Sequence, residues 1–353
     1  MTRTHQWYGE DEARSRFVLQ PADDGGMAMD DFYVCTRAVK KNAFDDEPGA
    51  TKFLRVPPVA AQALPGHAVA KGKWLADLRK QAVWGVNART GGQRGDVLLY
   101  VHGYNNSLVN VLTRQRRLAQ DLAAIGWKGC VVSFDWPSDD TAVAYLADRH
   151  DAKKTAMRLV TDLIGALAER QQPNCTINIH VIAHSMGALV VREAFDDADD
   201  AKLASNAWMV SQMCLIGGDI SADSLEDGDS DSDSLYRHCI RLTNYHSNLD
   251  SVLKLSNAKR AGLAPRVGRV GLPARAPRHA VNVDCSEYHA TLLASAIVQA
   301  SDQPGGFSGN KEHSWYIGNL KFTRDLFETL RGDLDRHVIP TRRQYSDGRL
   351  VLV

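Results

Sequence analysis

Ser185 stands in a segment whose residue types suit nucleophilic catalysis. The apolar run 177–182 leads into Ala183-His184-Ser185-Met186-Gly187, and the helix-forming run 188–195 follows. A strand, a sharp turn bearing a serine and a helix together expose the hydroxyl, which is a weak nucleophile until a base takes its proton. The usual pattern places glycine two residues before and two residues after the serine. Gly187 fits this pattern, whereas Ala183 adds one methyl group. The alternative is a buried turn whose serine has no catalytic role.

A carboxylate is expected after a later strand, because the order along the chain is serine, acid, histidine. Asp250 ends the polar turn after the strand expected at 239–244. It would accept a hydrogen bond from the Nδ1–H of the histidine and stabilise the imidazolium. Its alternative role is a helix N-cap, which needs no catalysis. Asp219, after the preceding strand, is the competing acid, and strand order favours Asp250.

His313 is the candidate general base. It follows a glycine-rich loop at 304–310 and precedes a closing helix, so the loop would deliver the imidazole to the serine. The alternative is an exposed loop histidine without a partner. His289 lies within the helical pattern 287–300, which favours a buried or a surface position. His184 is adjacent to the serine in sequence and cannot easily turn its ring onto the hydroxyl.

Two backbone N–H groups are expected to stabilise the oxyanion. The buried strand 97–101 is followed by His102-Gly103-Tyr104-Asn105-Asn106-Ser107. A His-Gly pair at this point lets the chain turn so that the N–H of Tyr104 faces the substrate carbonyl, together with the N–H of Met186. The loss of one such donor typically lowers the rate by about 100-fold or more. His102 is expected to brace the loop and to transfer no proton.

Alternating strands and helices must position these groups. Short apolar runs alternate with longer helical patterns, which predicts an α/β fold with a mostly parallel central sheet and helices on both faces. We expect one domain over residues 1–353, with residues 1–29 as an N-terminal extension. The expected strands are 31–37, 51–56, 96–101, 129–134, 176–182, 209–216, 239–244 and 280–285. The expected helices are 109–125, 142–170, 188–197 and 320–333.

Two charged segments interrupt this alternation. Residues 219–235 are densely acidic, and Asp227 to Asp231 resembles a calcium loop in part; Ser232 and His238 stand where that loop needs glycine and glutamate. A solvated, mobile loop is the favoured interpretation. Residues 254–279 are basic and rich in proline and glycine. They are expected to form a solvated surface excursion, and the alternatives are pairing with the acidic segment or binding of an anionic substrate.

The amino-acid composition limits which classes of partner and which cellular compartment are expected. The chain has 353 residues, with 42 basic and 42 acidic side chains, so it lacks the basic surplus of a nucleic-acid-binding protein. Arg114, Arg116 and Arg117 are expected to form a solvated helix face. No secretion signal or membrane span is visible. The cysteines show no metal-type spacing, and they are Cys35, Cys130, Cys175, Cys214, Cys239 and Cys285. We expect a cytoplasmic protein without a metal or cofactor.

The motifs together resemble a known group, the bacterial α/β-hydrolase family of unknown function that is often labelled esterase/lipase-like. The resemblance runs from about residue 30 to residue 320. It rests on the turn Ala183-His184-Ser185-Met186-Gly187 and on Asp250 and His313-Ser314. It also rests on Val101 to Ser107, Ser133-Phe134-Asp135-Trp136-Pro137-Ser138, Tyr145, Asp148 and Ala152. It implies an α/β-hydrolase fold and a triad of Ser185, Asp250 and His313. It does not imply a substrate.

The leading hypothesis is therefore a serine hydrolase that cleaves a small or lipid-like carboxylic ester through an acyl-enzyme intermediate. A peptidase, a thioesterase or an acyltransferase would use the same residues. A hydrolase scaffold that only binds a partner is the non-catalytic alternative. The presence of serine, acid and histidine in the expected order counts against that alternative.

Overall fold

The structure is a computed structural model that describes residues 29–138, 153, 155–169, 171, 174–200, 208–259, 264–294 and 311–353. Several expectations concern other residues: most of the extension at 1–29, the glycine-rich loop at 304–310, and Tyr145, Asp148 and Ala152. The expected helix at 142–170 lies partly outside the described residues. It includes a π-helical segment, η2 (Leu159–Ile164), and α4 (Gly165–Ala168).

The described strands form one sheet of 12 strands, in the order β11-β12-β10-β9-β8-β7-β5-β6-β1-β2-β3, with β4 paired to β5. Every neighbouring pair from β12 to β1 is parallel. The pairs β1–β2, β2–β3, β4–β5 and β11–β12 are antiparallel. The strand bounds are β1 (Asp31–Lys40), β2 (Ala43–Val56), β3 (Ala68–Val69), β4 (Val83–Val86), β5 (Gln93–Val101), β6 (Cys130–Asp135), β7 (Cys175–His184), β8 (Val210–Ile216), β9 (Cys239–His246), β10 (Ala280–Asp284), β11 (Arg342–Gln344) and β12 (Leu350–Leu352).

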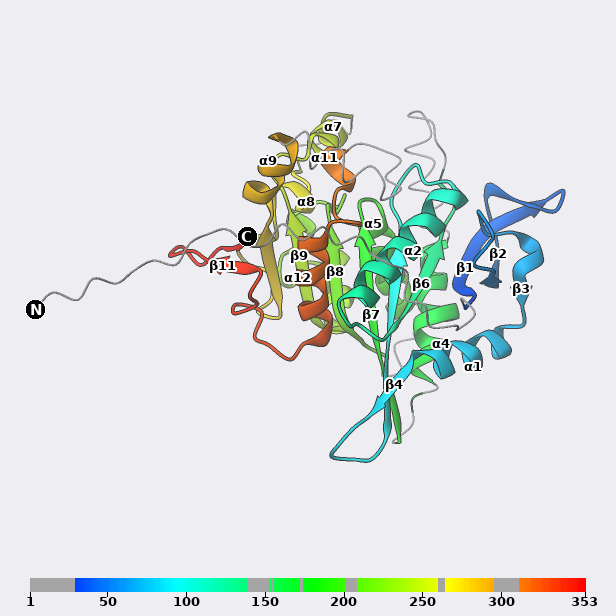
Figure 1. Ribbon diagram of the computed structural model, residues 1–353. Coiled ribbons are helices and arrows are strands. Elements are labelled where there is room, and N and C mark those ends of the chain that lie inside the picture. Colours follow the sequence, from blue (N-terminus) through cyan, green and yellow to red (C-terminus); the bar gives the residue numbers. More distant parts are fainter. Residues whose placement is uncertain are drawn as a thin grey trace, which may run out of the picture.

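Helices cover both faces of this sheet (Figure 1). The side chains of β5 alternate between two cores: Val97 and Leu99 pack with α1 and α5, and Leu98 and Tyr100 pack with α2 and α12. This alternation follows from the two-residue period of a strand. The remaining helix bounds are α1 (Lys71–Ala82), α2 (Leu108–Ala124), α5 (Gly187–Asp200), α6 (Ser230–Arg237), α7 (Ser251–Lys259), α8 (Val267–Val270), α9 (Ser286–Ala294), α11 (Lys311–Ser314), α12 (Leu320–Arg331), and the short 3₁₀ turns η1 (Pro65–His67) and η4 (Asp223–Leu225).

The predicted α/β architecture is confirmed. Each of the eight expected strands coincides with an observed strand to within a few residues at its ends. The exception is β2, which begins earlier than expected, at Ala43. The prediction omitted α1 and the short strands β3, β4, β11 and β12. Helix α1 has a detectable signal, because Trp74, Leu75 and Leu78 recur at helical spacing and are fully buried. Strand β11 has no such signal, because its sequence is Arg342-Arg343-Gln344.

The acidic segment 219–235 is not the solvated loop that its composition predicts. It includes η4 and most of α6, and the helix buries Leu235 and Tyr236. The Asp229 carboxylate accepts a hydrogen bond from the N–H of Asp231 and caps the helix. Acidic side chains in the first turn suit the positive end of the helix dipole, which explains why so acidic a segment is helical.

The basic segment 254–279 contacts the acidic one, so the favoured expectation of a solvated excursion is wrong for its described part. Arg266 is buried and forms an ion pair with Asp219 at 3.4 Å. Arg275 donates to Glu226 at 2.5 Å, and the N–H of Asp227 donates to the carbonyl of Arg275. Their opposite charges therefore join the two segments beside the carboxyl end of the sheet.

A helix that spans a bilayer needs about 20 predominantly apolar residues. Among the described residues, no helix is both long enough and apolar enough to span a membrane.

Candidate active site

Ser185 lies in the turn between β7 and α5 and has a positive φ of 55°. A non-glycine residue rarely adopts this left-handed conformation, and such strain concentrates at functional sites. The turn is held by hydrogen bonds from the Ser185 N–H to the Ile216 carbonyl and from the Asp219 N–H to the Ser185 carbonyl. The serine is 7% exposed. The geometry matches the strand–turn–helix arrangement expected around a serine nucleophile.

Two glycines allow the neighbouring backbone to approach this turn. A Cβ on Gly187 would lie 2.5 Å from the Val101 carbonyl oxygen, and a Cβ on Gly103 would lie 2.6 Å from the Cβ of Ser185. Both positions therefore require glycine. Ala183, where the usual pattern has glycine, is fully buried in β7, so its extra methyl group is accommodated in the core.

His313 and Asp250 form a buried pair. The His313 Nδ1 lies 2.7 Å from Asp250 Oδ2, and the two residues are 6% and 1% exposed. His313 belongs to the short helix α11 and is not an exposed loop residue. Its Nε2 is buried and has no hydrogen-bond partner among the described residues. A neutral imidazole that donates from Nδ1 therefore keeps Nε2 as a proton acceptor.

The pKa of His313 is raised above its ordinary value of 6.5. Burial alone would lower it, but the charge and hydrogen bond of Asp250, with a further contribution from Asp219, outweigh burial. The neighbouring His184 behaves in the opposite way. Burial and then the proximity of His313 hold the pKa of His184 well below 6.5, so it stays neutral. Its Nε2 donates to the His313 carbonyl at 3.2 Å, which supports the helix that bears His313.

Asp250 makes both of the contacts that the sequence left open. Its Oδ2 accepts from His313, while its Oδ1 caps α7 by accepting from the N–H of Leu253 at 2.9 Å. The turn is held by Arg269, which donates to the Asp250 carbonyl at 2.8 Å. The Ser247 carbonyl accepts from the Asp250 N–H, and the Ser247 hydroxyl bonds to the buried Nδ1 of His289 at 2.8 Å. His289 is therefore buried, which is one of the two positions expected for it.

Asp219, the competing acid, lies close to the same site. Its backbone contacts Ser185, and its carboxylate forms the ion pair with Arg266. The carboxylate that accepts from His313 Nδ1 is that of Asp250. The arrangement favours Asp250 as the orienting acid and gives Asp219 a longer-range electrostatic effect on His313.

Asn106 holds the loop that precedes α2, where one oxyanion donor is expected. Its side-chain amide donates to the Gly103 carbonyl at 2.9 Å and to the Tyr104 carbonyl at 3.0 Å. Its Oδ1 accepts from Arg114 at 2.6 Å. Arg114 is 4% exposed, so the expectation of a solvated arginine face is wrong at this position. The other two arginines of that face form ion pairs, Arg116 with Asp31 and Arg117 with Asp121.

His102 braces the same loop from the other side. Its Nδ1 donates to the Gly103 carbonyl at 2.8 Å, and its Nε2 lies 3.0 Å from Asp135 Oδ1. Asp135 also accepts from Arg37, at 3.0 Å from Nε. Burial alone would raise the pKa of Asp135, but Arg37 and His102 lower it to about 2. The indole of Trp136 stacks on His102 and donates to the His102 carbonyl.

The expected oxyanion donors, the N–H groups of Tyr104 and Met186, directly follow Gly103 and Ser185. The Met186 N–H forms no hydrogen bond within the described part of the chain. The sequence pattern did not predict the supporting roles of Arg37, Asn106 and Arg114. A buried arginine has no distinctive sequence signal, because only the tertiary structure shows which groups it contacts.

Comparison with known proteins gives a family match. The model of a family described as alpha/beta hydrolase of unknown function (DUF900) matches residues 84–293. No curated protein matches the chain.

Solved structures show weaker likenesses. Esterase B from Lactobacillus rhamnosis is 10% identical, with 67% of this chain and 75% of that chain covered and a TM-score of 0.35. A cutinase from Trichoderma reesei is 13% identical, with coverages of 50% and 68% and a TM-score of 0.28. Phospholipase PlaB from Legionella pneumophila is 16% identical, with coverages of 44% and 39% and a TM-score of 0.28.

Proposed function

Because the chain belongs to the alpha/beta hydrolases of unknown function (DUF900), we propose that it is a serine hydrolase that cleaves a carboxylic ester through an acyl-enzyme intermediate. The observation that carries the proposal is the buried His313–Asp250 pair, whose second imidazole nitrogen has no partner among the described residues. A strained serine on the adjacent turn supplies the nucleophile.

In the first half of the reaction, His313 Nε2 takes the proton from Ser185 Oγ while the oxygen adds to the ester carbonyl carbon. The π electrons of the carbonyl move to its oxygen, and the N–H groups of Tyr104 and Met186 stabilise that negative charge. His313 then gives the proton to the alcohol oxygen as the carbon–oxygen bond breaks. The alcohol leaves, and the acyl group remains on Ser185.

In the second half, His313 takes a proton from water while the water oxygen attacks the acyl carbon. Collapse of this intermediate returns the proton to Ser185 and releases the acid. Asp250 accepts from Nδ1–H throughout, so it stabilises the imidazolium that forms in both halves. An ester is proposed over an amide because its alcohol leaves more easily. The substrate would be a small or lipid-like ester.

Active-site labelling tests this proposal. We expect a fluorophosphonate probe to label the folded protein at Ser185, and Ser185→Ala to reduce hydrolysis of a short p-nitrophenyl ester by on the order of 10⁶-fold in kcat. Ser211→Ala, at the opposite end of the sheet, is the matched control and should retain labelling and activity. An unlabelled Ser185 in folded protein would refute the proposal, and so would a Ser185→Ala variant that remains active.

A further inference from the structure

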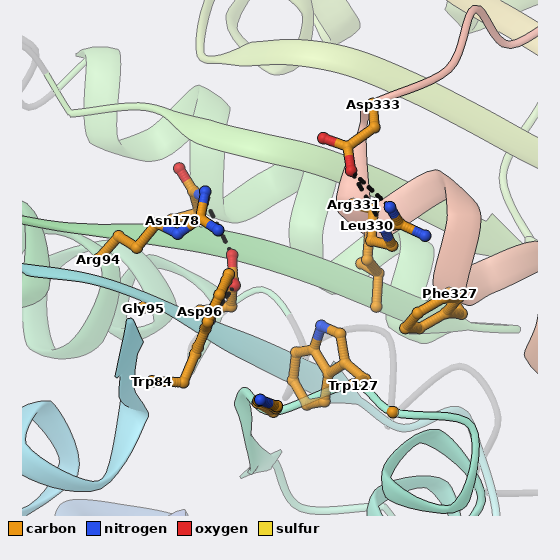
Figure 2. A pocket seen from close by; sticks show the side chains of 12 residues that line it. Trp84, Arg94, Gly95, Asp96, Trp127, Asn178, Phe327, Leu330, Arg331 and Asp333 are labelled. Carbon is orange, nitrogen blue, oxygen red and sulfur yellow. Dashed lines mark hydrogen bonds and ion pairs between the residues drawn. The ribbon is translucent and has the colours of Figure 1, made fainter. Parts of the chain in front are cut away.

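A cavity lies at the opposite end of the sheet from Ser185. Figure 2 shows the side chains that line it. Its volume is about 330 Å³, and it is formed where β5 and β7 begin, against the end of α12. Asn178 of β7 lines it, and Ser185 follows the same strand seven residues later. At about 3.3 Å per strand residue, the cavity is therefore roughly 23 Å from the serine. The proposed ester hydrolysis does not use it.

Aromatic side chains line the cavity and are held in place by specific contacts. The indole of Trp84 donates to Asp96 Oδ2 at 2.5 Å. Trp127 follows Gly126, whose φ of 96° ends α2, and its ring lies against Gly129. A Cβ on Gly129 would be 2.3 Å from the Trp127 ring, so glycine is needed there. Phe327 of α12 adds a third ring to the lining.

One indole N–H faces the cavity without a partner among the described residues. Trp127 is 7% exposed, and its Nε1–H forms no hydrogen bond with any described residue. Figure 2 shows the indole nitrogen directed toward the space between Asp96 and Leu330. Asp96 itself is satisfied, since it accepts from Trp84 and Asn178 and lies 3.0 Å from His180 Nε2. The free indole N–H is therefore available to an acceptor on a ligand.

The charges of the lining favour an anion. Arg94 stacks over the Trp84 ring at 4.3 Å, and neither Arg94 nor Lys128 forms an ion pair with another described residue. Arg331, the third cation, is paired with Asp333 at 2.8 Å. The three cations of the lining, Arg94, Lys128 and Arg331, outnumber its two carboxylates, Asp96 and Asp333. A guanidinium placed over an indole ring still has N–H donors that can bind a carboxylate.

We infer that this cavity binds a planar aromatic anion of one or two fused rings. The rings would pack between Trp84, Trp127 and Phe327, and the anionic group would accept hydrogen bonds from Arg94 and from the Trp127 N–H. The volume falls within the range of small-molecule sites in proteins. No bond is made or broken in this step.

Isothermal titration with 2-naphthoate tests the inference. For a ligand of this size we expect a Kd on the order of 0.1 mM, and much weaker binding of the neutral 2-naphthamide. Arg94→Gln should weaken binding by about 10-fold because a charge-assisted hydrogen bond is lost. Trp127→Phe keeps an aromatic ring at this position but replaces the indole by the smaller phenyl ring and removes the N–H, so it should weaken binding by at least about 5-fold.

Arg89→Gln is the matched control, because Arg89 lies on the exposed turn between β4 and β5 and outside the cavity lining. It should leave the Kd unchanged. Three results would each overturn the inference: no binding of naphthoate at several millimolar, equal binding by Arg94→Gln and the unaltered protein, or equal binding of the acid and the amide. Ester hydrolysis is not part of the readout, so this test and the labelling test fail independently.

Discussion

At the residue scale, the two carboxylate oxygens of Asp250 accept hydrogen bonds from different partners. One oxygen caps α7, and the other accepts from His313 Nδ1. Because the cap fixes the carboxylate, the aspartate orients the imidazole without needing to reorganise. The same carboxylate raises the pKa of His313 despite burial. The protonation state of the proposed base therefore depends on Asp250.

This dependence predicts a pH profile. The proposed base must be neutral to act, so kcat/KM should rise with pH through an inflection above the ordinary histidine pKa of about 6.5. Asp250→Asn should move that inflection to lower pH, because the neutral amide no longer stabilises the imidazolium. It should also reduce kcat by on the order of 10⁴-fold. Initial rates with a p-nitrophenyl ester from pH 5 to about 9 would measure both effects.

Asp219→Asn separates the two candidate acids. It should shift the inflection less and retain more activity than Asp250→Asn, because Asp250 holds the hydrogen bond to His313. Thermal unfolding of each variant should accompany the rates, since Asp219 is paired with buried Arg266. A larger rate loss in Asp219→Asn than in Asp250→Asn, with the protein still folded, would transfer the acid role to Asp219.

At the scale of elements, the site depends on how closely the loop after β5 approaches the turn after β7. Gly103 and Gly187 occupy this contact, with no space for a Cβ. Asn106 and His102 bind the carbonyls of the loop from two sides. The proposed oxyanion donors are therefore positioned by backbone packing, and an error of about 1 Å in such geometry can cost 100-fold in rate.

Gly103→Ala tests this positioning. The new methyl group would lie 2.6 Å from the Cβ of Ser185 and 2.9 Å from the His184 carbonyl oxygen, so one element must move. We expect activity to fall by at least about 100-fold and the free energy of unfolding to fall by about 1–3 kcal/mol. Urea unfolding and esterase assays measure the two effects.

Gly72→Ala provides the comparison, because Gly72 lies in α1 and a Cβ there would meet no atom within 4 Å. It should keep full activity and stabilise the protein by about 0.5–1 kcal/mol, since alanine favours helix over glycine. Full activity in Gly103→Ala would contradict the close-contact argument.

At the scale of the whole molecule, a buried ion pair joins the carboxyl-terminal strands to the sheet. Arg342 of β11 donates to Asp325 of α12 at 2.6 Å, and Tyr245 of β9 also donates to Asp325. Both charged side chains are fully buried. Strand β9 leads directly to the Asp250 turn, so this network fixes the end of the sheet from which the proposed acid projects.

Arg342→Met should destabilise the protein by about 3–5 kcal/mol, because it leaves the Asp325 carboxylate buried without its counter-ion. The double variant Arg342→Met with Asp325→Leu should recover much of that loss, since no unpaired charge remains. Arg343→Met, the exposed neighbour, should change the free energy of unfolding by no more than about 0.5 kcal/mol. Urea unfolding monitored by tryptophan fluorescence measures all three. A single variant as stable as the double would contradict the argument.

Much of this architecture could be predicted from the sequence because parallel strands buried on both faces consist of apolar runs. The runs around Val97 and Val181 identify β5 and β7 by this signal. Strand β11 could not be found, because its polar residues become a strand only by pairing with β12. Helix α6 was missed because its charged residues outnumber Leu235 and Tyr236, the two large apolar side chains that pack into the core.

Local sequence alone determined the order of strand, serine and helix around Ser185, and it identified the candidates Asp250 and His313. These features follow from short-range backbone preferences and side-chain chemistry. Only the tertiary structure decided which carboxylate accepts from His313, that Arg114 is buried beside Asn106, and that the acidic and basic segments contact each other. Such choices depend on distances between residues far apart in the chain, because hydrogen bonds and ion pairs act over a few ångströms, however many residues separate their partners.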